Sequence, residues 1–406
     1  MNPIASDIIS LKNSREIYQS SPAFKNYLRL DSGVTERILV VGGGIIGTMH
    51  ALLACEAGYE VLHIERDLKP TSASVRNFGL VWVSGRDTGP ELRLALRARS
   101  LWSAIGGKAE IGFRPNGSLT IASNEAEMNV LYEAANMDDA HLRGFRVLTN
   151  AETRALEPML AGKYLGALQC TEDAVVEPPI LLGGLRNYLS TFSTYSWKPG
   201  CEISDFYHDL TGNHVVDTSG NDYSSDYVVF CAGAAHGGFL SDYMNDATVR
   251  KVRLQMAATV PLKDKLGHSL ADGDSLRYYP AFKNLSIDHL PPQSRIASER
   301  YMQLLLVQRI DGSMTIGDTH EYDEPFDHEL VEAPYDHLRS VITSIFGREA
   351  PSLVKRWDGV YSQSTNSEIY FRKEIAPGAV IVTGGGGRGN TLSPAIAEET
   401  LLSWRN

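Results

Sequence analysis

Three glycines near the start of the chain have the spacing of a phosphate-binding turn. Gly42, Gly44 and Gly47 form G-x-G-x-x-G directly after the apolar run RILVV, and a segment with helical periodicity follows them. The first glycine permits a tight turn, the second lets the backbone approach a pyrophosphate, and the third allows helix and strand to pack closely. The N-terminus of the helix presents N–H groups to phosphates. The pattern predicts a dinucleotide-binding βαβ unit that opens near Arg37.

An acidic residue ends the second strand of this predicted unit. Glu65 lies about 20 residues beyond the glycines, at the position where a carboxylate accepts hydrogen bonds from ribose hydroxyls. A carboxylate here counts against NADP, because a 2′-phosphate would meet a like charge. The alternative is a glycine-rich turn that binds nothing, and the combination of strand, helix and acid disfavours it. The unit alone does not distinguish NAD from FAD.

A second glycine-rich segment lies near the C-terminus. Four consecutive glycines, Gly384 to Gly387, follow the apolar run AVIVT and precede a predicted helix. Such a run brings peptide N–H groups close to a flat ring, and a helix beginning near Thr391 or Ser393 favours negative charge at N1 and O2 of a reduced flavin. A flexible surface loop is the alternative. This segment favours a flavin.

Four segments together resemble the D-amino-acid oxidase superfamily, which includes glycine oxidase and sarcosine oxidase. They are VVGGGIIG with Glu65, TSASVRNFG from Thr71 to Gly79, VVFCAG at 228–233, and GGGGRGNTLSPA from Gly384 to Ala395. The resemblance covers most of the chain in the expected order. It implies an α/β fold, α+β overall, with a Rossmann-like FAD-binding domain interleaved with an antiparallel-sheet substrate domain.

The same resemblance implies which residues contact FAD. They are Gly42, Gly44, Ile46, Gly47, Glu65, Arg66, Ser72, Ser74, Arg76, Asn77, Phe78, Gly79, Val176, Ala232, Gly233, Gly386, Gly387, Gly389, Asn390 and Thr391. No cysteine follows Cys231, and residues 71–79 contain neither Cys nor His. The covalent linkage typical of sarcosine oxidases is therefore excluded, and we expect non-covalent FAD.

The length of 406 residues exceeds what one compact core usually reaches, and we start from two domains. Sequence patterns predict helices around 90–105, 124–136, 178–190 and 393–404, with mostly irregular sequence between the second and third. Strands are expected at 117–122, 227–233 and 379–383 and in runs within 251–319. The expected division is an N-terminal extension at 1–34, an FAD-binding domain at 35–90, 150–245 and 350–406, and a substrate domain at 91–149 and 246–349.

Composition narrows the class of partner. The formal net charge is −11, and Lys and Arg are scattered, which argues against nucleic acid and for a small molecule. The cysteines Cys55, Cys170, Cys201 and Cys231 lack C-x-x-C spacing, so no metal site is expected and a reducing compartment fits. We expect no transmembrane segment, no signal peptide and a cytoplasmic location.

One departure from the superfamily concerns the substrate. Its amino-acid and glycine oxidases bind the substrate carboxylate with an arginine in a G-x-R-P context. The matching stretch here is RWDGVYS, Arg356 to Ser362, and Tyr361 takes the arginine position. A phenol carries no charge and donates one hydrogen bond, so it is a poor substitute for a bidentate guanidinium. An ordinary α-amino acid is therefore disfavoured.

Five further stretches, SVRNFGL, VRLQM, RYYPAF, TIGDTHEY and RWDGVYSQS, resemble a subgroup proposed to oxidise aminophosphonates related to 2-aminoethylphosphonate. This resemblance implies an aldehyde product formed through an imine that hydrolyses. A phosphonate dianion requires two or more cationic or N–H donors, and the candidates are Arg86, Arg253, Arg277 and Arg309. For each arginine the alternative is a solvated charge or a structural ion pair.

Three residues are candidates for the chemistry itself. His320 can accept the proton of the substrate ammonium or donate to an anion, whereas a structural loop histidine is the alternative. Tyr278 and Tyr361 are the tyrosines we expect first in the pocket. His50 and His63, inside the βαβ unit, are interpreted as structural. The expected mechanism is hydride transfer from the amine-bearing carbon to flavin N5.

Several functions compete with this one. Oxygen or a quinone can reoxidise the flavin, and sequence does not separate an oxidase from a dehydrogenase. A glycine- or sarcosine-type oxidase would need another arginine, such as Arg309, for the carboxylate. A tRNA-modifying flavoprotein is disfavoured by the acidic charge balance. A non-catalytic flavin-binding subunit of a larger complex is the alternative from another class.

Overall fold

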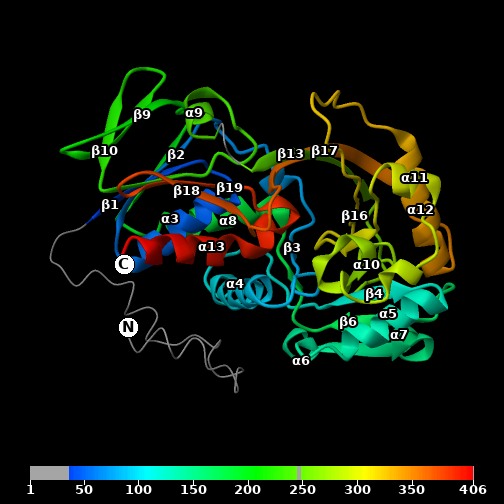
Figure 1. Cartoon of the computed structure of the whole chain (residues 1–406). Helices are drawn as coiled ribbons and strands as arrows, with labels where there is room; N and C mark the ends of the chain where they lie inside the picture. Colours follow the sequence, from blue (N-terminus) through cyan, green and yellow to red (C-terminus); the bar gives the residue numbers. More distant parts are fainter. Residues whose placement is uncertain (1–35, 245–247, 406) are drawn as a thin grey trace.

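The structure is a computed structural model that describes residues 36–244 and 248–405. The predicted extension at 1–34 lies outside the described residues. Two halves meet in the middle of the molecule, one built on a six-stranded sheet and the other on an eight-stranded sheet (Figure 1). The predicted fold class, a parallel dinucleotide-type sheet combined with a largely antiparallel one, is confirmed.

The six-stranded sheet contains the predicted βαβ unit. In sheet order its strands are β18 (Phe371–Ala376), β19 (Ala379–Thr383), β12 (Tyr227–Phe230), β1 (Arg37–Val41), β2 (Glu60–Glu65) and β8 (Tyr195–Pro199). β1 pairs in parallel with β12 and β2, and parallel pairing continues to β19 and β8. The edge strand β18 runs antiparallel. Continuous apolar runs such as AVIVT suit strands that are buried on both faces.

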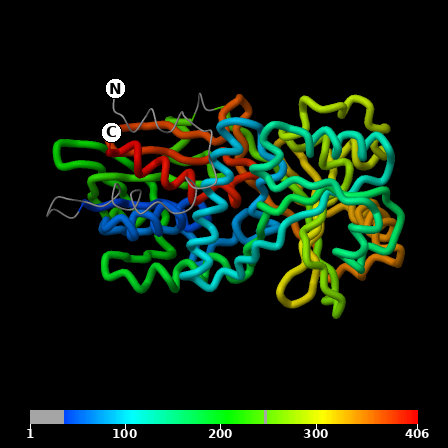
Figure 2. Tube along the Cα trace, turned by 90° about the horizontal axis from the view of Figure 1, so that it is seen from below, coloured from blue at the N-terminus to red at the C-terminus, as the bar shows by residue number. Residues whose placement is uncertain are grey.

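Helices pack beneath this sheet. They are α3 (Ile45–Ala57), α8 (Pro178–Leu189), α13 (Gly389–Ser403) and α4 (Pro90–Gly106), with α4 lying under α13 (Figure 1). α3 is buried on nearly every side because it contacts the sheet, α8 and α13. Viewed from below, the red C-terminal segment lies beside the blue N-terminal one (Figure 2). The C-terminal helix therefore completes the half that β1 begins.

The eight-stranded sheet forms the second half. In sheet order its strands are β17 (Leu353–Ser364), β13 (Val249–Thr259), β16 (Met314–Gly317), β15 (Leu305–Gln308), β14 (Ser269–Ala271), β4 (Ser118–Ala122), β6 (Gly166–Cys170) and β5 (Phe145–Thr149). Pairing is antiparallel except between β14 and β4. The helices of this half are α5 (Glu125–Ala135), α6 (Ala140–Arg143), α7 (Asn150–Leu156), α10 (Ser275–Tyr278), α11 (Arg295–Glu299) and α12 (Glu332–Phe346). The long pair β13 and β17 runs across the top between the halves (Figure 1).

Smaller elements complete the described chain. A three-stranded sheet contains β11 (Asp222–Ser225), β10 (Gly212–Asp217) and β9 (Ile203–Asp209), followed by the short helix α9 (Ser241–Met244). β3 (Leu80–Val81) pairs with β7 (Ala174–Val175) where the chain passes between the halves.

Two predictions of local structure were wrong or incomplete. The stretch between 136 and 178, expected to be mostly irregular, contains α6, β5, α7, β6 and β7. A local signal existed for α7, because Thr149 and Glu152 form a capping box at its start. β5 is an edge strand with weak alternation of buried residues, which explains why its pattern was missed. The amphipathic helix α12 also had no counterpart among the predicted helices.

The sheets divide the chain at other points than expected. β17 at 353–364, grouped with the FAD-binding segments, pairs with β13 in the eight-stranded sheet. Helix 90–106, placed largely in the substrate segment, packs on α13. β6 at 166–170 also lies in the eight-stranded sheet. The boundaries proposed at 350, 91 and 150 therefore need correction, because a long strand that leaves one half and crosses to the other shows no break in composition.

Candidate active site

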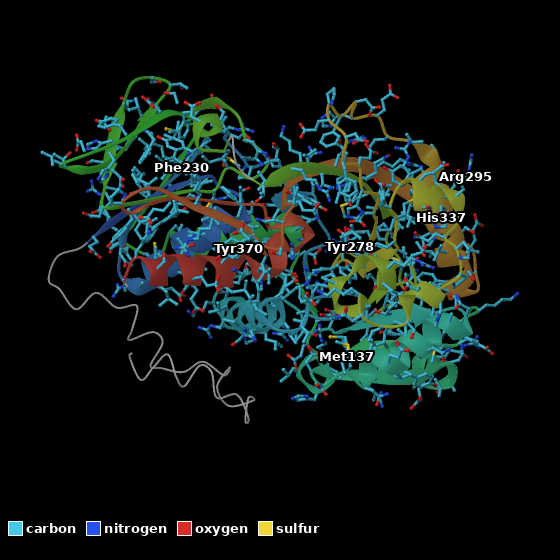
Figure 3. All side chains as sticks on the ribbon, viewed as in Figure 1. Met137, Phe230, Tyr278, Arg295, His337 and Tyr370 are labelled. Carbon is cyan, nitrogen blue, oxygen red and sulfur yellow. The ribbon has the colours of Figure 1, made fainter. Side chains whose placement is uncertain are left out.

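A cavity of about 1310 Å³ lies between the two halves. Its walls come from the β1–α3 turn, the 65–78 segment, residues 231–240, β17 and the glycine run at 384–390. Tyr278, at the junction of the halves in Figure 3, lines it as well. Sites for drug-sized ligands usually measure about 300–1,000 Å³, so this cavity has room for a dinucleotide together with a small molecule.

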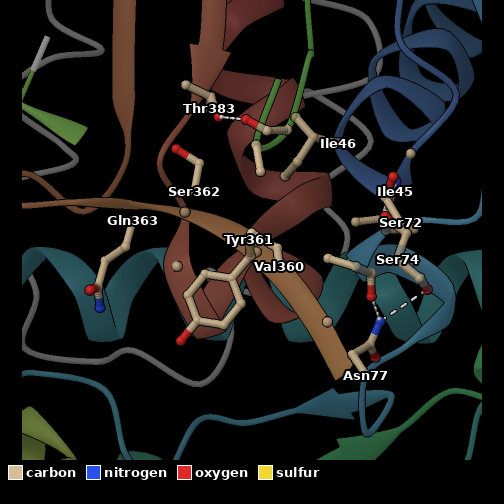
Figure 4. A pocket seen from close by; sticks show the side chains of 18 of the residues that line it. Ile45, Ile46, Ser72, Ser74, Asn77, Val360, Tyr361, Ser362, Gln363 and Thr383 are labelled. Atoms are coloured by element: carbon tan, nitrogen blue, oxygen red, sulfur yellow. Dashed lines mark hydrogen bonds between the residues drawn. The ribbon is translucent and has the colours of Figure 1, made fainter. Parts of the chain in front are cut away.

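Most of the predicted cofactor residues meet in this cavity. Those that line it are Gly42, Gly44, Ile46, Glu65, Arg66, Ser72, Ser74, Arg76, Asn77, Phe78, Ala232, Gly233, Gly386, Gly387, Gly389 and Asn390. In Figure 4, Ser72, Ser74 and Asn77 lie to one side of the β17 residues Val360 and Tyr361. Gly42 and Gly386, more than 300 residues apart in sequence, line the same cavity.

Two of the glycines predicted to contact the cofactor do not line the cavity. Gly47 does not line the cavity, and a Cβ there would lie 1.9 Å from the carbonyl oxygen of Gly42. Gly79, with φ of +67°, likewise lies off the lining, and its carbonyl accepts a hydrogen bond of 2.8 Å from the N–H of Val176. Val176 itself is fully buried away from the cavity. These three residues take part in close backbone packing next to the cavity, and their contact with the cofactor stays a prediction.

Thr391 also lies outside the lining. Its Oγ1 accepts a hydrogen bond of 2.9 Å from the N–H of Trp82 and donates one of 3.2 Å to the carbonyl of Leu80. The hydroxyl is thus occupied by the segment that follows the 71–79 stretch. Thr391 connects α13 to that segment through its hydroxyl, and its contact with the cofactor stays a prediction.

The first glycine turn has the donors that a pyrophosphate requires. Gly42 has φ of +117°, and a Cβ there would lie 2.3 Å from the Cys231 carbonyl oxygen, so the turn accepts glycine alone. α3 begins after Gly44 without a capping side chain and without an acidic residue in its first turn. The N–H of Ile45 donates to Ser74 Oγ at 2.9 Å, which holds the 72–77 segment against the helix start. An anion at this terminus would meet N–H groups and the positive end of the helix dipole.

Glu65 closes the other side of this turn. Its side chain is 8% exposed, and its two oxygens accept hydrogen bonds from the N–H groups of Gly43, at 2.5 Å, and Asp67, at 3.0 Å. Each carboxylate oxygen has a second lone pair. The buried carboxylate is therefore fixed at the cavity wall and able to accept from the hydroxyls of a ribose.

The second glycine segment lies at the other end of the cavity. Residues 386–388 form a 3₁₀ turn that leads into α13, and no side chain caps that helix. A Cβ on Gly387 would lie 3.7 Å from the hydroxyl oxygen of Tyr278 and 3.8 Å from that of Tyr361. Glycine thus keeps a bare backbone opposite two phenols. The N–H groups of this turn suit the polar edge of a flat ring.

Comparison with known families decides the identity of the cofactor. The family described as FAD dependent oxidoreductase, DAO, matches residues 37–401. The chain belongs to this family. Its cofactor is FAD, and the two glycine segments and Glu65 supply the donors and acceptor that FAD requires. The expected superfamily and cofactor are confirmed.

The individual relatives share only about a quarter of their aligned residues with this chain. The glycine oxidase of Geobacillus kaustophilus strain HTA426 is 27% identical over 206 residues, which span 48% of this chain and 54% of that protein. The glycine oxidase of Pseudomonas aeruginosa PAO1 is 26% identical over 348 residues, 83% of this chain and 86% of that protein.

Solved structures agree in fold. The crystal structure of the Geobacillus kaustophilus glycine oxidase has a TM-score of 0.73 at 20% identity, covering 91% of this chain and 95% of that one. L-proline dehydrogenase from P. horikoshii has a TM-score of 0.74 at 18% identity, covering 90% and 92%. At these identities the likeness is one of fold.

The three predicted catalytic residues of this flavoprotein lie together. His320 is 2% exposed, and its ring centroid is 4.6 Å from that of Tyr278. Its Nδ1 lies 3.0 Å from the Tyr301 carbonyl, which can only accept, so Nδ1 carries a proton and Nε2 is the other ring nitrogen. Burial raises the pKa of both Tyr278 and Tyr361 above that of a free phenol. Both phenols therefore stay neutral hydrogen-bond donors.

Two of the four predicted substrate arginines line the cavity. Arg86 is 3% exposed; its Nε donates to the Trp82 carbonyl at 2.9 Å, and its Nη1 lies 3.4 Å from Glu91. Arg277 lies 3.6 Å from Asp274 and also donates to a backbone carbonyl. Neither guanidinium is used up by these contacts, because each has five N–H groups.

The other two arginines are structural, which corrects their predicted role. Arg253 is 1% exposed and donates to the carboxylates of Asp358, at 2.9 Å, and Glu321, at 2.8 Å. Arg309 donates to Thr315 Oγ1 at 2.8 Å, and burial lowers its pKa to about 10. Neither lines the cavity.

Sequence reasoning missed several lining residues. Arg388, inside the glycine segment, lies 3.3 Å from Glu91, the same carboxylate that contacts Arg86. Asp318 and Gln303 also line the cavity, at the end of β16 and before β15. An acid directly after a predicted strand, as in TIGDTH, was a usable signal for Asp318, but the adjacent histidine drew attention instead.

Residues 36–244 and 248–405 contain neither a candidate membrane span nor a candidate metal site. No helix there is long and apolar enough to cross a membrane. Over the same ranges, no group of three His, Cys, Asp or Glu side chains is placed to hold a metal ion.

Proposed function

We propose that this flavoprotein oxidises a small primary or secondary amine that also carries an anionic group, with an aminophosphonate of the 2-aminoethylphosphonate type as the substrate class. The supporting observation is that Arg86 and Arg277 line the same cavity as Tyr278 and His320. Tyr361, which takes the position of the carboxylate-binding arginine in the resemblance, lines it without a charge. The cations therefore come from other elements than in the α-amino-acid oxidases.

Charge in this part of the cavity favours an anion. Glu91 lies between Arg86 and Arg388, so one carboxylate faces two guanidinium groups. Arg86 is buried, and its charge is weakly screened there. A phosphonate presents three oxygens, which suits two guanidinium groups with several donors each.

Bound FAD supplies the acceptor for the hydride that leaves the carbon next to nitrogen. The protein orients that carbon through the two arginines at the anionic end of the substrate. Nε2 of His320 is the group that accepts the proton that the substrate ammonium must lose first. Tyr278 and Tyr361 shield this end of the cavity from bulk water. Water then hydrolyses the imine product to an aldehyde, releasing ammonia from a primary amine substrate and an amine from a secondary one.

A panel of amines tests this proposal. Purified protein with its flavin absorbance is mixed anaerobically with 2-aminoethylphosphonate, its N-methyl and 1-hydroxy derivatives, glycine, sarcosine and D-alanine. We expect a phosphonate to bleach the flavin band and Arg86→Gln and Arg277→Gln to slow bleaching at low concentration by about tenfold or more. Arg295→Gln, at an exposed position in α11, is the matched control. Bleaching by glycine or sarcosine and not by phosphonates contradicts the proposed substrate.

A glycine- or sarcosine-type oxidase or dehydrogenase is the second candidate. It is supported by the names of the two bacterial relatives, both glycine oxidases. Since Arg309 does not line the cavity, Arg86 or Arg277 would have to bind the carboxylate. Hydrogen peroxide measured during aerobic turnover separates oxygen from a quinone as the acceptor for either substrate class.

A further inference from the structure

Asp318 is a buried acid in the cavity wall with an unused oxygen. Its side chain is 5% exposed and lines the cavity, and its Oδ1 has no hydrogen-bond partner among the described residues. Within the same residues, no Lys, Arg or His nitrogen lies within ion-pair distance of it. Burial raises its pKa, whereas the neighbouring His320 and a hydrogen bond from the Gln303 side chain lower it. A buried carboxylate oxygen without a donor is unfavourable, so Oδ1 is suited to a ligand that brings the donor.

A second unused acceptor lies beside it. Gln303 is 2% exposed and lines the same cavity, and its Oε1 also lacks a hydrogen-bond partner in the described part of the chain. The backbone holds the two residues together, since the N–H of Asp318 donates to the Gln303 carbonyl at 3.0 Å. Two acceptor oxygens without donors call for a group rich in N–H bonds. A phosphonate or carboxylate offers only acceptors and does not satisfy them.

The surroundings are aromatic. Tyr278, Tyr322 and Tyr361 line the same cavity as Asp318. The ring of His320 stacks against Tyr322 with centroids 6.4 Å apart. Aromatic faces attract cations, and more strongly when water is excluded. The Asp318 carboxylate, the Gln303 amide oxygen and the aromatic ring faces can all bind an ammonium group.

We propose that Asp318 and Gln303 bind the ammonium group of the substrate, at the opposite end from the anion held by Arg86 and Arg277. This assignment rests on the proposed oxidation of an amine and adds the residues that recognise its nitrogen. His320, two residues from Asp318, is then adjacent to the proton that must leave. The substrate class is thereby restricted to amines that enter as cations.

A cation that cannot be oxidised tests the assignment apart from turnover. tert-Butylammonium has no hydrogen on the carbon next to nitrogen, so it cannot lose a hydride, and tert-butanol is its neutral counterpart. Binding of each to the FAD-loaded protein is followed by the shift of the flavin spectrum and by the rise in melting temperature. We expect the ammonium ion to bind and the alcohol to bind at least tenfold more weakly.

Variants then locate the binding. Asp318→Asn should weaken tert-butylammonium binding by about tenfold or more and leave tert-butanol unaffected, whereas Asp311→Asn, on an exposed turn, should change neither. If Asp318→Asn loses flavin or fails to fold, Gln303→Met replaces it, because this change removes the amide and keeps the carboxylate; a several-fold loss is expected.

Equal binding of the cation by wild type and both variants would overturn the assignment, as would equal binding of cation and alcohol by wild type. Loss of cation binding in the variants supports the assignment even where no phosphonate bleaches the flavin, and that outcome refutes only the substrate named under the proposed function.

Discussion

His63 donates a hydrogen bond from Nε2 to the carbonyl oxygen of Gly42, 3.0 Å away. A carbonyl can only accept, so Nε2 carries the proton, and Nδ1 accepts from the hydroxyl of Tyr195 at 3.1 Å. The ring is completely buried. A neutral imidazole on β2 thus fixes the first glycine of the phosphate-binding turn. The structural interpretation of His63 from sequence gains a specific role: the residue supports the cofactor site.

Acid should destabilise the protein through this histidine and its neighbour. Burial lowers the pKa of His63 and of His50 to about 4, from about 6.5 in the unfolded chain. Both are neutral above pH 6.5, so their contribution is fully present there. It is lost as pH falls from 6.5 to 4, because the unfolded chain takes up the protons first. The loss is on the order of 3 kcal/mol for each histidine.

Urea unfolding between pH 7.5 and 4 measures this effect. The variant His63→Gln should show a shallower fall in unfolding free energy over this range than the wild type, by about one proton of slope. His141→Gln, at an exposed position, should match the wild type. An unchanged slope in His63→Gln would show that His63 is not the titrating group.

The third glycine of the turn should tolerate no side chain. In Gly47→Ala the new Cβ would lie 1.9 Å from the Gly42 carbonyl oxygen and 3.3 Å from Val40 Cγ1, so the turn must move. We expect the purified variant to lose most of its FAD, read from the visible absorbance per protein. Gly183→Ala in α8 is the matched control, because nothing lies within 4 Å of its Cβ. That control should keep its FAD and gain up to about 1 kcal/mol from helix propensity.

Arg253 should matter for folding rather than for the substrate. Arg253→Met removes the buried guanidinium from the carboxylates of Asp358 and Glu321, which keep longer arginine contacts, with Arg76 at 3.8 Å and with Arg300 at 3.4 Å. Breaking a buried ion pair typically costs about 3–5 kcal/mol of unfolding free energy. Urea unfolding should show such a loss, while the concentration of amine that half-saturates bleaching stays within about twofold of wild type. A large change in that concentration with normal stability would show that Arg253 does bind the substrate.

The contrast among the arginines shows what sequence was able to predict. Leu254 and Met256 line the cavity, and Arg253 directly precedes Leu254 in β13. Since side chains alternate across a strand, the apolar residues at 254 and 256 already place Arg253 on the opposite face. That correction was available from the sequence. The sequence did not show that Arg86 and Arg277 line the cavity and Arg309 does not. That difference depends on how loops from both halves of the molecule meet.

The phosphate-binding turn was predicted correctly because all of its parts are close together in the sequence. Strand, glycine turn, helix and Glu65 are neighbours in sequence, and their spacing alone fixes the phosphate-binding turn. The residues proposed to bind the substrate are not close together in the sequence. Tyr361 comes from β17, and Asp318 follows the end of β16. These two strands are each paired with β13, and no local pattern reports that arrangement.

Tyr361 should act on the substrate and leave the fold unaffected. Its hydroxyl is buried and has no hydrogen-bond partner among the described residues, although it lies 3.8 Å from the Cβ position of Gly387 opposite Tyr278. Removing an unsatisfied buried hydroxyl leaves no partner stranded, so Tyr361→Phe should keep its FAD and unfold within about 1 kcal/mol of wild type. The phenol is raised in pKa by burial and remains a donor, and its loss should slow anaerobic bleaching by about tenfold. Tyr188→Phe, remote from the cavity, should bleach at the wild-type rate. A Tyr361→Phe protein that bleaches as fast as wild type would show that this phenol only fills space, and that the position of the missing arginine has no part in recognition.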